Sequence, residues 1–322
     1  MKRLCNCIIF IILFTLLLPT GARAAQLLIP GGQVVGLQLR NDTLTVAAFD
    51  DSIGSCAKDS GLRVGDELLM VNGQNVRSVQ EVRCALEGAG QPATVTIRRN
   101  SRTETLEVVP RITADGPRLG VYLKQGIAGI GTITWYDPGT GVFGTLGHGV
   151  NEPNGKLANL VSGNAFPAEV ISVKKGACGD PGQLKGNADA HNACGTLLRN
   201  TPQGVFGISR QGWPGEPLPV ADYDGICAGS AIIRSTVAGN AVREYSVEIL
   251  KIYPENKSDG RNFLLKVTDP ALLSATGGIV QGMSGSPIIQ DGKLVGAVTH
   301  VLVNDPTRGY GIFIENMLDA AA

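Results

Sequence analysis

The chain has 322 residues, of which 43% are hydrophobic and 17% are charged, so it holds enough apolar material for more than one domain core. Its 28 basic and 28 acidic residues balance, which gives no electrostatic footprint for nucleic acid or an anionic membrane. The 43 glycines, 17 prolines and 5% aromatic residues disfavour a helical bundle and favour short strands joined by tight turns. We therefore expect a mainly β protein of two domains that does not bind nucleic acid.

Residues 1–25 have the pattern of an export signal. Lys2 and Arg3 precede an apolar run, Ile8–Leu18, and the small residues of Ala22-Arg23-Ala24 follow it. The run of 11 residues is shorter than the roughly 20 that a membrane-spanning helix needs. A cleaved signal peptide is the first prediction, and an uncleaved N-terminal membrane anchor is the alternative. In both cases the rest of the chain is expected outside the cytoplasm.

Five of the seven cysteines follow this leader, and an odd number cannot pair completely within one chain. An exported location permits disulfides, and the plausible pairs are Cys56 with Cys84 and Cys178 with Cys194. The alternative is that all five are small buried hydrophobic residues with free thiols. The sequence does not decide between the two.

Residues 33–110 form the first predicted domain. A Gly-Leu-x-x-Gly-Asp-x-Leu-Leu-x-Val-Asn-Gly run ends at the turn pair Asn72-Gly73, and a helical pattern follows over residues 79–86. This arrangement resembles an α+β PDZ domain, which implies a groove beside the helix where an extended peptide adds as a strand. The resemblance places the loop that holds a peptide's terminal carboxylate at Gly36, Leu37, Gln38 and Leu39. The alternative is a small β domain without a ligand.

Residues 116–322 read as short strands separated by glycine turns, which predicts a closed β-barrel or a pair of barrels. Their strongest motif is Gly282-Met283-Ser284-Gly285-Ser286-Pro287, where glycines allow a tight turn that exposes the Ser284 hydroxyl. The backbone N–H groups of Gly282 and Ser284 could converge as an oxyanion hole, in which one lost donor costs about 2.7–4 kcal/mol. The run resembles the nucleophile segment of chymotrypsin-like serine peptidases, although Ser286 replaces the usual second glycine. A plain hairpin turn is the alternative.

A serine nucleophile needs a base, and the chain has only three histidines. His148 lies between glycines at the end of a predicted strand and precedes Ser284, which is the order found in chymotrypsin-like enzymes. His191 falls in a polar loop and His300 on the strand after the nucleophile, where surface and core roles are expected. His148 is the predicted base, with His300 and His191 as alternatives.

The third member of such a site is a carboxylate that orients the histidine. Asp269 ends an apolar strand 15 residues before Ser284, but an aspartate before a proline is also a common helix N-cap. The residues alone do not choose it over Asp137, Asp180, Asp222 or Asp224.

The chain after the leader resembles the SpoIVB family of sporulation serine peptidases over nearly its whole length. The likeness rests on the PDZ-like module, Gly147-His148-Gly149, the glycine stretch 175–182, residues 199–207, and Val267-Thr268-Asp269 shortly before the nucleophile turn. It implies a catalytic triad of His148, Asp269 and Ser284. The spacing of Asp269 and Ser284 is much shorter than in digestive chymotrypsin-like enzymes, which leaves the barrel topology open.

The resemblance also implies export from the forespore into the space between two membranes of a sporulating bacterium. There the enzyme is expected to cleave itself and the extracytoplasmic segment of a membrane-bound regulatory protein, which activates a late sigma factor. No cofactor or metal is expected, since Cys178, His191 and Cys194 lack zinc-site spacing. The alternative function is a non-catalytic PDZ adaptor with a degenerate barrel.

Overall fold

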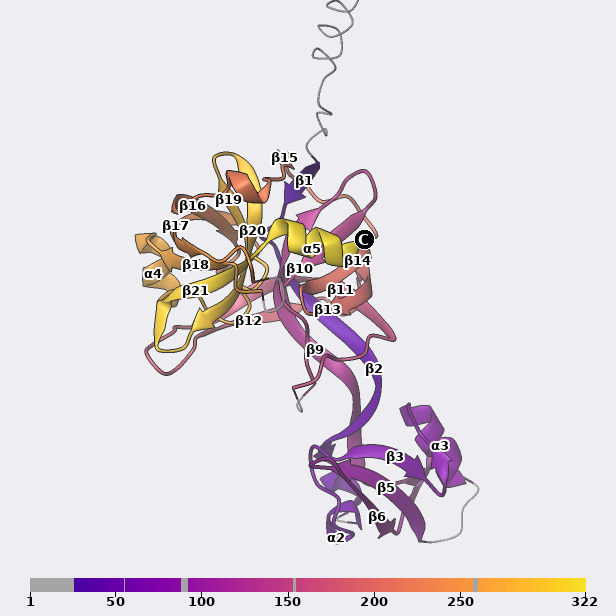
Figure 1. The fold of residues 1–322 in the computed structure, drawn as a ribbon. Coiled ribbons are helices and arrows are strands. Elements are labelled where there is room, and N and C mark those ends of the chain that lie inside the picture. The colour runs from indigo at the N-terminus through magenta and orange to yellow at the C-terminus, as the bar shows by residue number, and fades with distance from the viewer. Residues whose placement is uncertain (1–25, 55, 88–91, 153–154, 257–259) are drawn as a thin grey trace, which may run out of the picture.

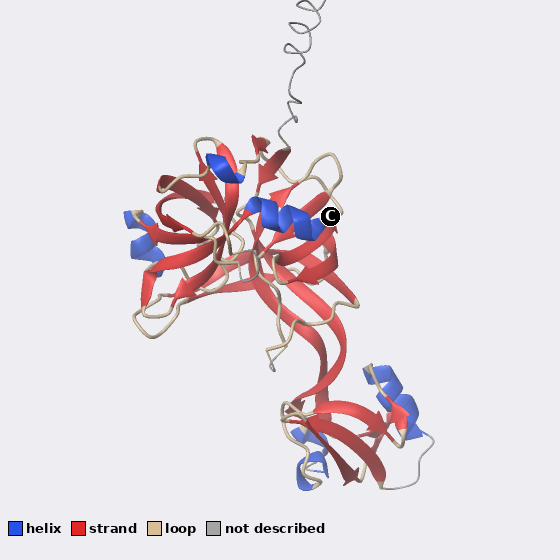
Figure 2. Cartoon of the chain, viewed as in Figure 1, coloured by secondary structure: helices blue, strands red, loops and turns tan. Residues whose placement is uncertain are grey.

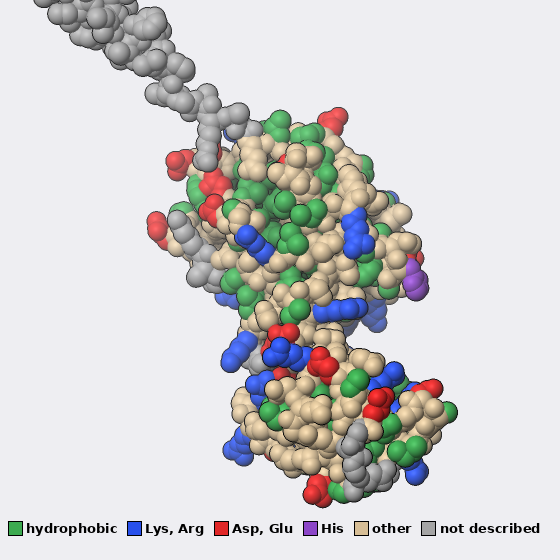
Figure 3. Space-filling view, turned by 90° about the vertical axis from the view of Figure 1, so that its right-hand side faces the viewer, with side chains coloured by type: hydrophobic (Ala, Val, Ile, Leu, Met, Phe, Trp, Pro, Cys, Tyr) green, Lys and Arg blue, Asp and Glu red, His purple; other side chains and the backbone are tan. Residues whose placement is uncertain are grey.

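The structure is a computed structural model that describes residues 26–322 except 55, 88–91, 153–154 and 257–259. The predictions for the leader, residues 1–25, lie outside the described residues. Strands dominate the chain, which forms a large lobe and a small lobe (Figures 1 and 2). A narrow waist joins the two lobes (Figure 3). Within the described ranges, no helix combines the length and the apolarity that crossing a membrane requires.

The small lobe is the PDZ-like domain. Its elements are η1 (Asp51–Ile53), α2 (Cys56–Asp59), β3 (Glu67–Val71), β4 (Gln74–Asn75), α3 (Val79–Glu87), β5 (Ala93–Arg99), β6 (Arg102–Val108), β7 (Arg111–Thr113) and β8 (Gly116–Arg118). Apolar side chains from β3, β5 and the buried face of α3 share one core. The buried carboxylate of Asp66 is satisfied there by the guanidinium of Arg99, 2.6 Å away. The domain therefore has a core of its own.

The large lobe contains two rings of six antiparallel strands. The first ring is β2 (Val34–Phe49), β9 (Val121–Tyr136), β10 (Val142–Thr145), β14 (Gly204–Ser209), β13 (Gly195–Thr201) and β11 (Ser162–Lys174), with β1 (Leu27–Pro30), β12 (Gln183–Ala188) and β15 (Leu218–Pro219) alongside. The pairing of β2 with β9 closes this ring.

The second ring is a closed barrel. It consists of β16 (Gly229–Ser235), β17 (Arg243–Ile252), β18 (Phe263–Val267), β21 (Asp305–Phe313), β20 (Lys293–Leu302) and β19 (Pro287–Gln290), with η2 (Tyr223–Gly225), α4 (Pro270–Thr276) and α5 (Ile314–Ala321) outside. The predicted fold class, a PDZ-like α+β domain followed by a chymotrypsin-like barrel domain, is confirmed.

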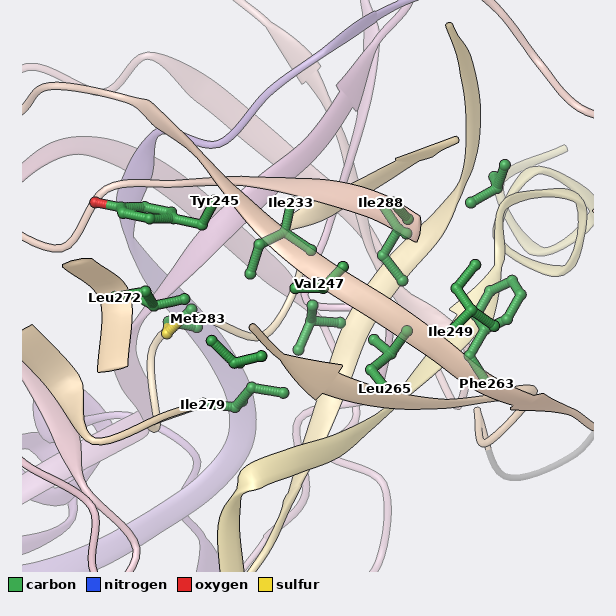
Figure 4. Close-up of a cluster of buried hydrophobic side chains, with 14 of the residues drawn as sticks. Ile233, Tyr245, Val247, Ile249, Phe263, Leu265, Leu272, Ile279, Met283 and Ile288 are labelled. Atoms are coloured by element: carbon green, nitrogen blue, oxygen red, sulfur yellow. The ribbon is translucent and has the colours of Figure 1, made fainter. Parts of the chain in front are cut away.

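The period-2 pattern of the strands fills the second barrel. Tyr245, Val247 and Ile249 alternate along β17 and point into the barrel, where they meet Ile233 and Leu265 from the neighbouring strands (Figure 4). Successive side chains of a strand point to opposite faces, so every second residue reaches the core. The turn that carries Ser284 directly precedes β19, one of the strands that enclose this packed core.

The predicted domain boundary and carboxylate loop need correction. Residues 36–39 do not form a loop of the small lobe; they lie within β2 in the first barrel. There, β2 pairs with β11 on one side and with β9 on the other, so its backbone is committed to the sheet. Gly36 is required for packing, because a Cβ at that position would collide with the Ala188 side chain. The PDZ-like core begins only at Leu44.

The cysteines form neither of the predicted disulfide pairs, and of the five only Cys194 is buried as the alternative expected. Cys56, Cys84, Cys178, Cys194 and Cys227, the five that the structure describes, all have free thiols. Cys194 is buried, and its burial raises the pKa of the thiol to about 11, which keeps it protonated and unreactive.

Candidate active site

A cavity of about 460 Å³ lies where segments of the two barrels meet. His148 enters it from the segment that follows β10 of the first barrel, and Ser284 enters it from the turn before β19 of the second. Aliphatic side chains such as Ile130 and Val280 form much of the remaining wall. The fold therefore brings the predicted base and the predicted nucleophile, which are far apart in sequence, to one place.

The backbone before His148 adopts an unusual conformation. Leu146 has a φ of 71°, a left-handed value that is costly for a branched side chain, and Gly147 follows with a φ of 68°. Gly147 is packed so closely that a Cβ there would press on the Thr299 and Ile312 side chains. These two residues turn the chain sharply at the end of β10 and direct His148 into the cavity.

The imidazole of His148 is oriented by a backbone carbonyl. Its Nδ1 lies 2.9 Å from the Gly149 carbonyl oxygen. Because a carbonyl can only accept, Nδ1 carries the proton and Nε2 keeps its lone pair, which is the tautomer that a general base needs. Burial lowers the pKa of His148 below its usual value, since the charged imidazolium loses hydration there. The ring is therefore neutral and basic at neutral pH.

The nucleophile turn depends on two glycines. Gly282 and Gly285 have φ values of 99° and 95°, which other residues rarely adopt. At Gly285 a Cβ would collide with the Thr132 carbonyl and the Leu146 amide, so glycine is also required for close approach. The glycines that flank Ser284 in the motif are thus explained by both conformation and packing.

Neighbouring hydrogen bonds orient the two predicted oxyanion donors. The Gln281 carbonyl accepts from the Leu184 N–H at 2.8 Å, and the Met283 carbonyl accepts from the Ser286 N–H at 2.9 Å. In a trans peptide the N–H points opposite to the carbonyl, so the N–H groups of Gly282 and Ser284 point away from these partners. In the described part of the chain neither N–H donates to another protein group. Both are available to an incoming oxyanion.

The Ser284 hydroxyl donates to the Thr299 carbonyl at 2.8 Å in this state. A hydroxyl has one proton to donate, so Ser284 must release the Thr299 carbonyl before it can donate to His148. Ser286 is buried and donates to the Ser235 hydroxyl, which leaves Ser284 as the serine that faces the cavity.

The position of His300 differs from the core role expected for it. It lines the cavity beside Thr299, and its ring centroid is 5.3 Å from that of His148, with the rings tilted by 38°. His300 is a cavity residue and is not part of a packed core. The alternating pattern of β20 does not predict that His300 lies near His148, because His148 belongs to the first barrel and is far away in the sequence. His191 is exposed in its loop, and its N–H donates to Asp189.

Asp269 lies elsewhere. Its carboxylate caps α4, accepting from the Ala271, Leu272 and Ser246 N–H groups at 2.9, 3.0 and 3.3 Å. It is not among the described residues that line the cavity of His148 and Ser284. The structure thus gives it the N-cap role that its position before Pro270 suggested. Its role as the triad acid stays a prediction, which requires the carboxylate to leave this cap.

Asn200 is a second residue that the sequence did not single out by its chemistry. Its Oδ1 accepts from the Val150 N–H at 2.9 Å, and its Nδ2 donates to the Val150 and Ala158 carbonyls at 2.8 Å each. These bonds fix the segment that follows His148 and supplies the Gly149 carbonyl. Asn200 therefore holds the base's immediate backbone in place.

The PDZ-like domain has a separate groove of about 230 Å³. Val79, Val82 and Leu86 of α3 form one wall, and the other wall is the segment 117–123, which runs from the end of β8 to the start of β9. In this segment β9 pairs with β2 only, so among the described strands its second edge is open. An open strand edge facing a helix is the geometry that accepts an added peptide strand.

The described residues include no group of three or more His, Cys, Asp or Glu side chains placed to hold a metal ion.

Comparison with known families identifies the chain by its sequence. The sequence profile of the family described as SpoIVB peptidase S55 matches residues 115–318, well over half of the chain. The chain belongs to the SpoIVB peptidase S55 family. A PDZ domain profile matches residues 52–99 within the small lobe. The family named in the sequence analysis is thus confirmed, and its members are serine peptidases.

Among solved structures, the chain is similar to the PDZ domain of the SdrC-like protein from Listeria monocytogenes, with 22% identity, a TM-score of 0.22, and coverage of 26% of this chain and 87% of that one. It is also similar to the Rv3671c protease of M. tuberculosis. The inactive form shows 14% identity, a TM-score of 0.37, and coverage of 60% of this chain and 84% of that one. The match to the active form has the same identity and TM-score and covers 61% of this chain and 73% of that one. No curated protein matches the chain.

The lowered pKa of His148 predicts how the S55 site responds to pH. Below this pKa the imidazolium cannot accept a proton from Ser284, so labelling by a fluorophosphonate probe should rise with pH and level off near neutrality. We expect the midpoint below the usual histidine value of about 6.5. The measurement is the second-order labelling rate from pH 4.5 to 8. The control His300→Gln removes the neighbouring imidazole and should keep an inflection in the labelling rate against pH. A midpoint above 7 in the wild-type protein would contradict the assignment of His148 as the base.

The N-cap contacts of Asp269 predict the effect of substitutions there. Asparagine caps a helix about as well as aspartate, so Asp269→Asn should keep the melting temperature and label within about threefold of the wild-type rate. Asp269→Ala should lose about 1 kcal/mol of unfolding free energy. If Asp269 orients His148, Asp269→Asn should instead lower the rate by about 10⁴-fold without unfolding.

Proposed function

We propose that the chain is an exported serine endopeptidase that uses Ser284 as nucleophile and His148 as general base. The observation that carries this proposal is that the two side chains line one cavity, together with Gly282, and that among the described residues the N–H groups of Gly282 and Ser284 donate to no protein acceptor. Family membership supports the reaction class.

The proposed reaction is acyl transfer in two halves. Ser284 Oγ attacks the carbonyl carbon of the scissile peptide while its proton passes to Nε2 of His148, and the oxyanion binds the N–H groups of Gly282 and Ser284. The C–N bond then breaks, and the departing amine takes the proton from His148. A water molecule then attacks the acyl carbon while its proton passes to the same imidazole. The bond between the acyl carbon and Ser284 Oγ breaks, His148 returns the proton to Oγ, and the carboxylic acid leaves.

Two features help His148 in both acylation and deacylation: the burial of its ring and its hydrogen bond to the Gly149 carbonyl. Burial keeps the free ring neutral, and the carbonyl holds the Nδ1 proton so that Nε2 keeps the lone pair that can accept the serine proton. When the ring becomes an imidazolium, the same carbonyl accepts a stronger, charge-assisted hydrogen bond. A carboxylate from Asp269 would add to this stabilisation only after leaving the α4 cap.

For the biological role we propose a sporulation signalling protease. The enzyme is exported from the forespore to the intermembrane space, where it cleaves itself and the extracytoplasmic segment of a membrane-bound regulatory protein, and so triggers a late sigma factor. Membership in the SpoIVB peptidase S55 family and the export pattern of residues 1–24 support this proposal.

We further propose that the PDZ domain binds peptide termini in the groove between α3 and the start of β9. Gly120 has a φ of 77°, and Arg83 and Arg118 line the same groove, so a carboxylate would meet both backbone and positive charge there. The apolar side chains of Val79 and Val82 suit a terminal apolar residue. This location replaces the loop predicted at residues 36–39.

Ser284→Ala tests the nucleophile. It should abolish fluorophosphonate labelling and self-cleavage while leaving the melting temperature within about 2 °C, since the side chain is only half-buried. The matched control is Ser286→Ala, which removes a buried hydroxyl two residues away and should still label. A wild-type protein that is folded but never labelled would favour the inactive adaptor, and labelling retained by Ser284→Ala would exclude this nucleophile.

Val79→Asp tests the groove. Val79 is 40% exposed on its wall, so a charge there should block an apolar peptide terminus without unfolding the domain. We expect at least a tenfold loss of affinity for a fluorescent hexapeptide that ends in valine with a free carboxylate, measured by anisotropy. Val109→Asp, at a 54% exposed site away from the groove, should bind normally. Equal binding of the amidated peptide would contradict carboxylate recognition.

A further inference from the structure

Thr132 contacts the nucleophile turn more extensively than its place in the sequence suggests. It lies on β9 of the first barrel and is 1% exposed. Its hydroxyl donates to the Gly282 carbonyl at 2.8 Å, and its N–H donates to the Ser284 carbonyl at 3.1 Å. One residue of the first barrel therefore binds two carbonyls of a turn that belongs to the second.

The two carbonyls lie on either side of the peptide that carries the Ser284 N–H. The Gly282 carbonyl belongs to the peptide before it, and the Ser284 carbonyl belongs to the peptide after it. Fixing both neighbours restricts rotation of the peptide between them, which supplies one of the proposed oxyanion donors. The Thr132 hydroxyl acts on this donor without touching the substrate.

Thr132 also binds the segment that leads to the base. Its carbonyl accepts from the Thr145 hydroxyl at 2.6 Å and from the Leu146 N–H at 3.4 Å. Leu146 is the strained residue two positions before His148. The same buried residue is thus joined to both chain segments that must meet for acyl transfer.

From these contacts we propose that Thr132 is a positioning residue: its hydroxyl sets the nucleophile turn in the geometry that aims the Ser284 N–H at the oxyanion. The inference rests on the proposed nucleophile and base. It assigns the alignment of these two groups to Thr132, which is neither of them. Displacing reacting groups by about 1 Å can cost on the order of 10² in rate, so the loss of this bond should appear in the chemical step.

The experiment compares Thr132→Val, Thr132→Ser and wild type by fluorophosphonate labelling at several probe concentrations. Valine keeps the shape but removes the donor, and serine keeps the donor. We expect Thr132→Val to lower the limiting labelling rate ten- to a hundredfold, with the half-saturating probe concentration unchanged, and Thr132→Ser to stay within about threefold of wild type. The pH midpoint should not move, because the surroundings of the His148 ring are unchanged.

Thr236→Val is the matched control for loss of a buried hydroxyl. Thr236 is 0% exposed, and its hydroxyl donates to the Gly32 carbonyl at 2.9 Å, away from the nucleophile turn. It should lower the melting temperature about as much as Thr132→Val does, but label at the wild-type rate.

Three results would overturn the inference. Thr132→Val could label as fast as wild type, Thr236→Val could be equally slow, or Thr132→Ser could fail to restore the rate. Each of these differs from failure of the proposed function, in which the wild-type chain itself would not label.

Discussion

The candidate site depends on direct hydrogen bonding between β9 of the first barrel and the turn before β19 of the second. Thr132 binds the carbonyls of Gly282 and Ser284, and Gly285 lets the two backbones approach without a side chain between them. Because each barrel has its own packed core, this contact sets how the base of one barrel meets the nucleophile of the other. The dense packing of both cores makes that relationship rigid.

The electrostatics of the site come mainly from backbone groups. The Gly149 carbonyl orients His148, the Thr299 carbonyl accepts from the Ser284 hydroxyl, and the N–H groups of Gly282 and Ser284 are the proposed oxyanion donors. Such groups are fixed by the fold and require little reorganisation during reaction, which is the condition for effective stabilisation of a developing charge. Burial keeps His148 neutral, so the site holds an unprotonated base at neutral pH.

One long strand connects the two lobes. β9 begins beside the PDZ groove at Val121 and runs with β2 from the small lobe to the large one (Figure 1). It includes Thr132, which donates to two carbonyls of the nucleophile turn. β2 likewise contributes its first half to a barrel and its second half to the PDZ core. The domains are therefore interleaved in sequence, and the groove of the PDZ-like domain and the cavity of His148 and Ser284 share one structural element.

The sequence by itself determined the local chemistry. The glycines around Ser284 and His148, the PDZ motif and the alternating strands predicted the fold class, the nucleophile and the base, because turns and strand periods are written in neighbouring residues. Only the tertiary structure decided which distant segments meet. It placed Asp269 at a helix cap, His300 in the cavity, residues 36–39 inside a barrel and the peptide groove at β9. These outcomes depend on pairings between strands far apart in the chain, which local patterns do not encode.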